Sequence, residues 1–255
     1  MTISNGILLF FAAFAAGVLN SVAGGGSFFS FPALIFAGVP PIPANATSTV
    51  ALWPGTVAST GAYRNKIPHS MRMLTPLLIA SVAGGFFGAK LLLHTPQRTF
   101  MRLIPFLFLA ATLLFAFGKK LFRGARPATE ASQPSWPVVC GVTAIQFCVA
   151  IYGGFFGGGM GILMLAFLSL LPLGDIHATN GVKTLLVSAT NGVALVTFVL
   201  ARIVFWPQAI LMLAGAALGG YGGAHYAQRL NPARVRTFVV FVGLTMSFYF
   251  LWRYH

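Results

Sequence analysis

Apolar residues along this chain come in long runs, separated by short polar or glycine-rich interruptions. The runs cover approximately residues 6–22, 27–39, 46–63, 73–93, 100–117, 137–153, 160–172, 178–200, 207–227 and 235–252. A helix that crosses the hydrocarbon core of a bilayer needs roughly 20 residues. Six or more of the runs reach that length, whereas 27–39 and 160–172 are too short to cross alone. The pattern predicts an all-α, polytopic integral membrane protein with two short or broken helices.

Four sequence features occur twice, in the same order, in the two halves of the chain. The matching segments are 24–26 and 157–159, 46–47 and 178–179, 84–89 and 219–224, and 95–98 and 231–234. Their offset stays between 132 and 136 residues, which indicates an internal duplication. We therefore predict a first transmembrane repeat at 1–118, a cytoplasmic linker at 119–136 and a second transmembrane repeat at 137–255, each repeat with about five helical segments.

Composition supports a membrane protein and excludes several other classes. Of the 255 residues, 16 are basic and 2 acidic, whereas about a quarter of a soluble protein is charged. Because Glu130 and Asp175 are the only acids, catalysis by paired carboxylates and a carboxylate metal cage are excluded. Cys140 and Cys148 lie in one apolar run, about 12 Å apart along a helix, too far for a local disulfide. We predict no enzyme activity, no metal and no cofactor.

The basic residues predict how the chain is oriented, because Lys and Arg in short loops stay on the cytoplasmic side. If each half crosses five times, ten basic residues lie inside and five outside. If each glycine run and its flanks form one broken crossing, the repeats are parallel, and nine basic residues lie inside and six outside. We favour the first arrangement, which predicts inverted repeats with both termini outside. The net charge of +14 then reflects topology and attraction for anions, not nucleic acid binding.

Two triple-glycine runs, each followed by a short apolar segment, are the first candidate for a substrate site. Glycine lets a ligand approach the backbone, and inverted repeats bring two such breaks together with helix N-termini facing an anion. The alternative is close helix packing, which we favour for Gly84-Gly85 and Gly219-Gly220. The candidate site residues in the triple runs are Gly24, Gly25, Gly26, Gly157, Gly158 and Gly159.

Lys183 is the second candidate, since it is the only charge clearly inside a predicted crossing. Charges at this depth are costly and face a polar pathway. On a helix that begins near His177, a polar stripe with a spacing of three to four residues includes Asn180, Lys183, Ser188 and Asn191. Alternatively, the Lys183 stem reaches the interface, because the residue lies about 9 Å from the helix start. We predict that Lys183, Asn180 and Asn191 contact an anion.

Hydroxyl and amide side chains near the glycine runs are the third candidate. The segments 45–49 and 177–180 are predicted helix starts, where such side chains either cap the helix or bind a ligand, and both roles are compatible. His177 lies two residues after Asp175, and a titrating histidine there would couple transport to protons. The candidates of this group are Asn20, Ser21, Ser27, Thr47, Ser48, Thr179 and His177.

The segment GVLNSVAGGGSFFSFPALIFAGVPPIPANATSTVALWPGTVAS and its counterpart FFGGGMGILMLAFLSLLPLGDIHATNGVKTLLVSATNG resemble the two signature repeats of the TauE/SafE family of sulfite exporters. The resemblance covers essentially the whole chain. It implies a multi-pass transporter of the bacterial inner membrane for sulfur-containing anions such as sulfite, sulfoacetate or thiosulfate. Leu165 stands where the first repeat has Pro32, so the two sites need not be equivalent. The residues that match the signatures are Gly24, Gly25, Gly26, Pro32, Ala46, Thr47 and Ser48, and Gly157, Gly158, Gly159, Ala178, Thr179, Asn180 and Lys183.

These features together predict an exporter that works by alternating access around a site at the membrane midplane. An inside-negative potential drives anions outward by about 2.3 kcal/mol per charge per 100 mV. Because a buried carboxylate is not available for coupling, we favour facilitated export over coupling to protons or sodium. The alternatives are an anion channel and a transporter of non-sulfur organic anions. The expected partners are a small anion and the lipid bilayer.

Overall fold

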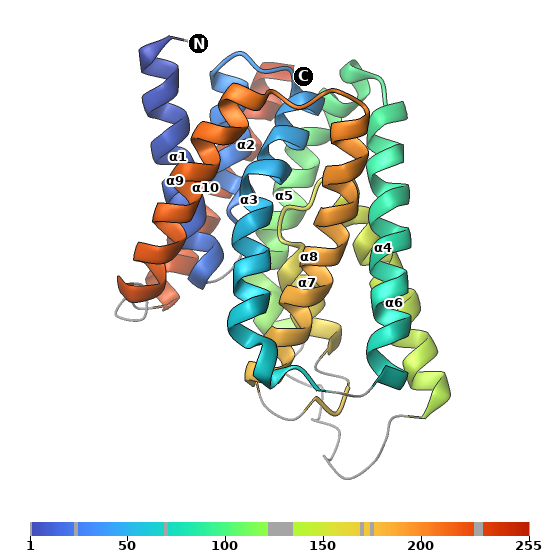
Figure 1. Cartoon of the computed structure of the whole chain (residues 1–255). Helices are drawn as coiled ribbons and strands as arrows, with labels where there is room; N and C mark the ends of the chain where they lie inside the picture. Colours follow the sequence, from blue (N-terminus) through green and yellow to red (C-terminus); the bar gives the residue numbers. More distant parts are fainter. Residues whose placement is uncertain are drawn as a thin grey trace.

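The computed structural model describes residues 2–22, 25–68, 71–121, 135–168, 171–173, 176–226 and 232–254 (Figure 1). These residues form ten α-helices and one short 3-10 helix, with no strand among them. The helices are α1 (Ile3–Val22), α2 (Ser27–Phe36), α3 (Pro41–Tyr63), α4 (Met71–His94), α5 (Gln97–Leu121), α6 (Trp136–Phe155), α7 (Met160–Leu168), α8 (Ile176–Leu200), α9 (Trp206–Tyr226) and α10 (Pro232–Tyr254), and the 3-10 helix η1 is Arg64–Lys66.

The predicted all-α, polytopic membrane fold is confirmed. Within the described part of the chain, five helices are long and apolar enough to cross a bilayer, with spans at Ile3–Asn20, Met71–His94, Gln97–Leu114, Trp136–Phe155 and His177–Leu200. The two short apolar runs form α2 and α7, of 10 and 9 residues. At 1.5 Å per residue they are about half as long as the hydrocarbon core is thick.

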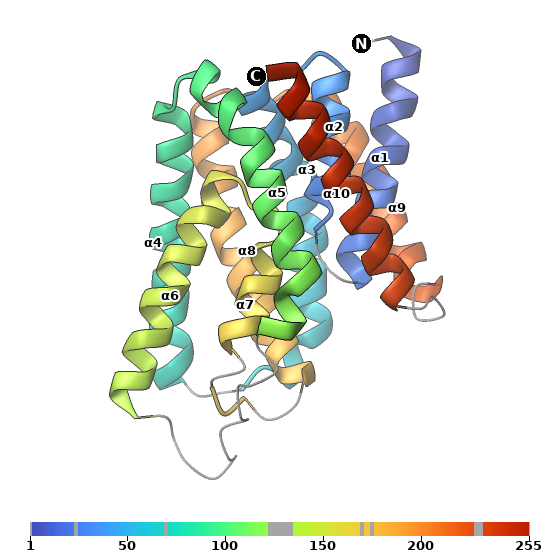
Figure 2. The same ribbon diagram turned by 180° about the vertical axis from the view of Figure 1, so that it is seen from behind.

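The long helices of one half of the chain pack mainly against helices of the other half. The principal contacts join α1 to α9, α4 to α6, α3 to α8 and α5 to α10. Counterpart helices run in opposite directions, since α1, α3 and α5 descend in Figure 1 while α6, α8 and α10 ascend. Both chain ends therefore lie at one end of the bundle, and α5 finishes at the other (Figures 1 and 2). This is the arrangement that an inverted repeat would have, and the division into two repeats stays a prediction.

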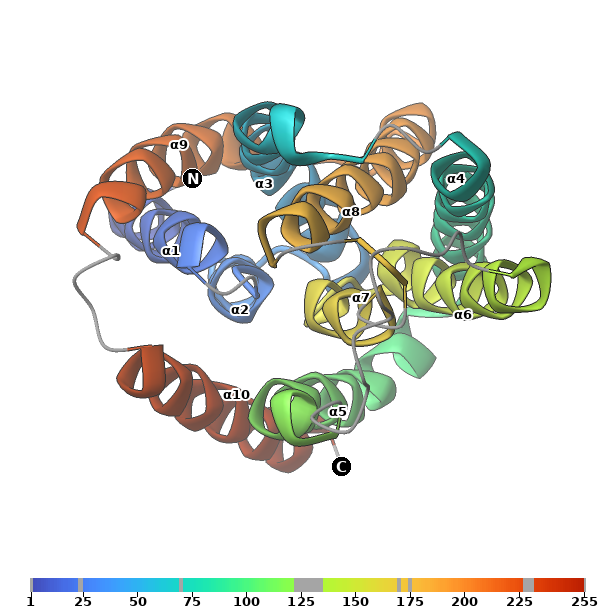
Figure 3. The same ribbon diagram turned by 90° about the horizontal axis from the view of Figure 1, so that it is seen from below.

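The two short helices lie inside the bundle. Figure 3, viewed along the helices, shows α2 and α7 surrounded by longer helices. Phe31 of α2 is buried, and its ring packs at centroid distances of 5.8–6.5 Å against four other rings. These rings belong to Phe100, Phe108, Phe156 and Phe250. The aromatic cluster fixes α2 against α5, α10 and the segment that follows α6.

Glycines allow helices of the two halves to approach each other closely. A Cβ atom on Gly84 of α4 would lie 2.6 Å from the Cβ of Ala150 in α6, and one on Gly85 would lie 2.7 Å from the carbonyl oxygen of Thr190. A Cβ on Gly219 of α9 would overlap the carbonyl of Phe14 in α1. The predicted packing role of Gly84, Gly85 and Gly219 is therefore confirmed, because no larger residue fits at these crossings.

Candidate substrate site

The first break, between α1 and α2, is held by Asn20. The backbone amide of Gly26 donates a hydrogen bond of 2.8 Å to Asn20 Oδ1. Gly25 has a φ of +96°, which glycine adopts without strain. A Cβ atom on Gly26 would lie 2.7 Å from the carbonyl oxygen of Ala16, so the turn requires a residue without a side chain there. Gly24 and the side chain of Ser21 lie outside the described residues.

The second break, residues 156–159 between α6 and α7, is built in a similar way with a different side chain. The Tyr152 hydroxyl donates a hydrogen bond of 2.5 Å to the carbonyl oxygen of Gly158. Gly157 and Gly159 have φ values of +78° and +74°. Sequence reasoning missed Tyr152, because a tyrosine near the end of an apolar run looks like a packing residue. Both breaks thus end a long helix, turn at glycine and begin a short one.

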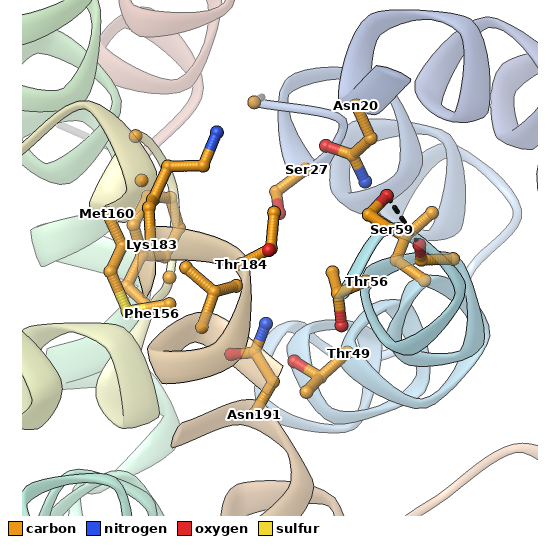
Figure 4. Close-up of a pocket in the computed structure, with 17 residues that line it drawn as sticks. Asn20, Ser27, Thr49, Thr56, Ser59, Phe156, Met160, Lys183, Thr184 and Asn191 are labelled. Carbon is orange, nitrogen blue, oxygen red and sulfur yellow. Dashed lines mark hydrogen bonds between the residues drawn. The ribbon is translucent and has the colours of Figure 1, made fainter. Parts of the chain in front are cut away.

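A cavity of about 100 Å³ lies where the two breaks face α3 and α8 (Figure 4). Since one water needs roughly 10–15 Å³ on this measure, the cavity has room for several waters or a small solute. The first residue of α2 and the first two residues of α7 border it, and the location of a substrate site at the membrane midplane stays a prediction. The lining residues are Asn20, Gly25, Ser27, Thr49, Leu52, Gly55, Thr56, Ser59, Phe156, Gly157, Gly159, Met160, Gly161, Lys183, Thr184, Val187 and Asn191.

Lys183 is the one charged side chain among the described residues that line this cavity. Its Nζ donates a hydrogen bond of 3.1 Å to Asn180 Oδ1, so Asn180 holds the lysine instead of lining the cavity itself. Asn191 lies two turns further along α8 and does line it. The Ser188 carbonyl accepts a hydrogen bond of 3.0 Å from Trp53 Nε1. The predicted polar stripe is therefore shared between the cavity and the α3–α8 contact.

Polar residues of α3 form the opposite wall. Thr49, Thr56 and Ser59 line the cavity across from Lys183 (Figure 4). Sequence reasoning considered Thr49 only as part of a helix start and missed the other two. The signal was available, because residues 49, 52, 56 and 59 repeat at the same spacing of three to four as the stripe of α8.

Thr47 and Ser48 are placed away from the cavity. The Thr47 Oγ1 accepts a hydrogen bond of 3.0 Å from the amide of Phe205, and the Ser48 and Ser30 hydroxyl oxygens are 2.6 Å apart. The predicted helix start and N-cap at residues 45–49 is wrong, because α3 begins at Pro41 and no side chain caps it. Proline fits the first turn of a helix, where the missing amide hydrogen is not needed.

The cavity lies toward the end of the bundle where α3 finishes and α8 begins. Residues 44–48 of α3 are buried, whereas its residues from 53 to 63 are partly or fully exposed. The buried part carries three cross-connections, from Thr47 and Ser48 as above and from Asn45 Nδ2 to the carbonyl of Phe155 at 3.2 Å. These bonds connect α3 to the last residue of α6, to α2 and to the turn between α8 and α9, at the end of the bundle that holds the two chain ends.

The structure brings about half of the predicted site residues together. Those that line the cavity are Asn20, Gly25, Ser27, Gly157, Gly159, Lys183 and Asn191. Those placed elsewhere are Gly26, Gly158, Thr47, Ser48, Thr179, Asn180 and His177. His177 is exposed in the first turn of α8, and its neighbour Asp175 lies outside the described residues. Among the residues that the structure describes, no group of three or more His, Cys, Asp or Glu side chains is placed to hold a metal ion.

The sequence profile of the sulfite exporter TauE/SafE family matches residues 9–250. The chain belongs to this family. It is 30% identical to the probable membrane transporter protein ORF9 of Sinorhizobium sp over 94% of this chain and 89% of the relative. It is 29% identical to the probable membrane transporter protein YfcA of Escherichia coli K12, over 97% of this chain and 90% of the relative. No solved structure gives a significant match. This TauE/SafE protein is therefore a multi-pass membrane transporter.

Proposed function

We propose that this protein exports small sulfur-containing anions, such as sulfite, sulfoacetate or thiosulfate, across the bacterial inner membrane. The observation that carries the proposal is the position of Lys183, the one charged side chain among the described residues that line the cavity between α3 and α8. A cation in a low-dielectric site is stabilised by an anionic ligand. The family supplies the class of anion, since its description names sulfite exporters.

The neutral polar groups around Lys183 suit an oxyanion. Ser27 lines the cavity between Lys183 and α3, and the Asn191 amide lines it two turns along α8, toward Thr49 (Figure 4); both side chains have hydrogens to donate. Gly161 borders the cavity in the first turn of α7; the neighbouring amides of Met160 and Ile162 donate to the carbonyls of Gly157 and Gly159, and the helix N-terminus favours negative charge. An anion would thus exchange its hydration for several fixed donors and one full charge.

The arrangement of the helices supports alternating access. In our proposal the two halves form inverted repeats and rock about the breaks, so that the cavity opens first to the cytoplasm and then to the outside. In this proposal the bonds of Asn45, Thr47 and Ser48, which cross-connect α3 at the end of the bundle that holds the chain ends, would have to break for that side to open. Export would proceed down the membrane potential, because acidic residues for ion coupling are scarce.

Binding and transport assays on the purified protein test this proposal. Calorimetry with sulfite, thiosulfate, sulfoacetate and acetate should show saturable binding of the sulfur anions and weaker binding of acetate. In proteoliposomes, labelled anion inside should exchange for unlabelled anion outside, which is the counterflow of a transporter. Current that does not saturate, together with absent counterflow, would identify a channel. Equal or tighter binding of acetate would favour a transporter of organic anions.

A further inference from the structure

The hydroxyl groups of α3 that face the cavity are already donating hydrogen bonds. Thr49 Oγ1, Thr56 Oγ1 and Ser59 Oγ each donate to a backbone carbonyl three or four residues earlier in α3, at 2.8–2.9 Å. A hydroxyl has one hydrogen to donate and two lone pairs to accept with. These three side chains therefore present acceptor oxygens to the cavity. This wall of acceptors is unexpected for a site that binds only a bare oxyanion.

Two of the three acceptors are free to receive a ligand. The Thr56 oxygen accepts a hydrogen bond of 3.3 Å from Ser188 Oγ. Within the part of the chain that the structure describes, no hydrogen bond ends on the oxygen of Thr49 or Ser59. Thr184, on α8, likewise donates its hydrogen to the carbonyl oxygen of Gly181 at 2.9 Å. The cavity thus offers acceptors that its own described side chains leave unused.

The positive charge lies on the other side of the cavity from these oxygens. Figure 4 shows Lys183 across from Thr49, Thr56 and Ser59, with Ser27 between them. Lys183 Nζ has three hydrogens and uses one of them on Asn180. The site therefore has its full positive charge at Lys183, whereas the α3 wall presents acceptor oxygens, beside which the amide side chains of Asn20 and Asn191 also line the cavity.

A single positive charge also limits the charge of the ligand. The two halves are related by an offset of 132 residues around the Ala-Thr pairs, so the residue of the first half that corresponds to Lys183 is Ala51. Ala51 is buried, so the first half supplies no second cation at the equivalent position. One lysine neutralises one negative charge, and every further charge on the anion stays uncompensated in a medium of low dielectric constant.

We propose that the site selects a monoanion that carries its own hydrogen-bond donor, with the anionic group at Lys183 and the donor on the oxygens of Thr49 and Ser59. This inference rests on the proposed function and narrows its substrate class. Hydrogensulfite and hydroxyalkanesulfonates have both properties. Thiosulfate and sulfoacetate are dianions, and unsubstituted alkanesulfonates lack a donor. A ligand without a donor leaves the acceptor oxygens of α3 desolvated and unpaired.

Two sulfonates of equal charge and similar size test the donor. Calorimetry on the detergent-purified full chain should show that 2-hydroxyethanesulfonate binds about three to ten times more tightly than propane-1-sulfonate, the range expected for one neutral hydrogen bond. Equal affinities, or a preference for propane-1-sulfonate, would overturn the inference. Sulfoacetate, with a second charge, should bind more weakly than 2-hydroxyethanesulfonate, and tighter binding would contradict the limit to one charge.

Variants of the acceptor wall locate the effect. Ser59→Ala and Thr49→Val should each reduce the affinity for 2-hydroxyethanesulfonate toward that for propane-1-sulfonate, while propane-1-sulfonate binding stays unchanged. Thr49→Ser keeps the hydroxyl and should keep the preference. Thr245 of α10 makes the same kind of bond within its helix at 2.9 Å on an exposed face, so Thr245→Val is the matched control. A preference that survives both Ser59→Ala and Thr49→Val would place the donor elsewhere and reject the assignment.

The two proposals fail in different ways. If wild-type protein binds neither sulfonate and no sulfur anion, the proposed function falls and this inference falls with it. If it binds both sulfonates with the same affinity, the proposed function stands and only the selection for a donor is rejected. Thermal unfolding of each variant shows whether a loss of binding comes from loss of the fold.

Discussion

The Thr47 hydroxyl of α3 accepts a hydrogen bond of 3.0 Å from the backbone amide of Phe205, in the turn between α8 and α9. Thr47 is fully buried. The bond joins α3 of the first half to a connection of the second half, at the end of the bundle that holds the two chain ends. This contact between the halves is thus secured by a hydroxyl and not by apolar packing alone.

We predict that Thr47→Val lowers the stability of the folded protein. Valine has nearly the same shape but leaves the Phe205 amide without its acceptor, which costs about 1–3 kcal/mol. The midpoint of thermal unfolding should fall by about 2–4 °C per kcal/mol for a chain of this size. Thr47→Ser keeps the acceptor and should unfold close to wild type. If the valine and serine variants unfold at the same temperature, the hydrogen bond from Phe205 to Thr47 does not stabilise the fold.

Lys183 is expected to supply most of the affinity for an anion. Lys183→Ala removes a charged donor from the cavity, and hydrogen bonds to charged groups contribute about 1.5–3 kcal/mol, which corresponds to a loss of roughly 10-fold to 150-fold in Kd. Calorimetry with sulfite at two salt concentrations measures the loss. Lys90 of α4 is exposed and lies 5.8 Å from the ring of Phe86, so Lys90→Ala is the control. Unchanged affinity and salt dependence in Lys183→Ala would remove Lys183 from the site.

The crossing of α4 and α6 should not tolerate a methyl group at Gly84. Its Cβ would lie 2.6 Å from Ala150 Cβ and 2.7 Å from the carbonyl of Phe147, and overpacking costs about 1–3 kcal/mol. Gly141, on the exposed part of α6, has open space around the same position. We therefore expect Gly84→Ala to lower the unfolding midpoint and Gly141→Ala to leave it unchanged or raise it. If Gly141→Ala lowered the unfolding midpoint more than Gly84→Ala, the contact between α4 and α6 would not be as tight as the structure shows.

Cysteine labelling tests the orientation. Asn65 of η1 and Ala201 after α8 are both exposed and lie at opposite ends of the bundle. In a variant without the native Cys140 and Cys148, which are also exposed, a cysteine at position 65 should react only from the cytoplasmic side. A cysteine at position 201 should react only from outside. A cysteine at position 124 should, like the one at position 65, react only from the cytoplasmic side. Labelling of position 65 or position 124 from outside would reject the predicted topology.

The sequence predicted the helices well because their apolar runs are long and their interruptions are glycine-rich. It also placed Gly25, Gly157 and Lys183 at one site, since an intramembrane lysine and an internal repeat are strong signals. The start of α3 was harder to place. Proline at positions 40, 41 and 43 looks like a helix breaker, whereas in the structure it forms the first turn.

The α3 wall escaped prediction for a physical reason. Threonine and serine in membrane helices can donate their hydroxyl hydrogen to a backbone carbonyl of the same helix. Sequence alone therefore does not show whether Thr56 or Ser59 faces lipid, another helix or a cavity. The distinction depends on how α3 packs against α8, which is set by contacts such as Trp53 on the Ser188 carbonyl. Thr47 was misassigned for a related reason, because its acceptor role requires a loop 158 residues away.

The half-length of α2 has an electrical consequence. It contains 10 residues, about 15 Å at 1.5 Å per residue, against a hydrocarbon core about 30 Å thick. In the proposed alternating-access cycle, a state that opens the cavity to solution on one side would leave only about half of this thickness as insulation, with α2 among the helices that form it. The full membrane voltage would then fall over about half the usual distance, and the field there would be about twice that in the surrounding bilayer.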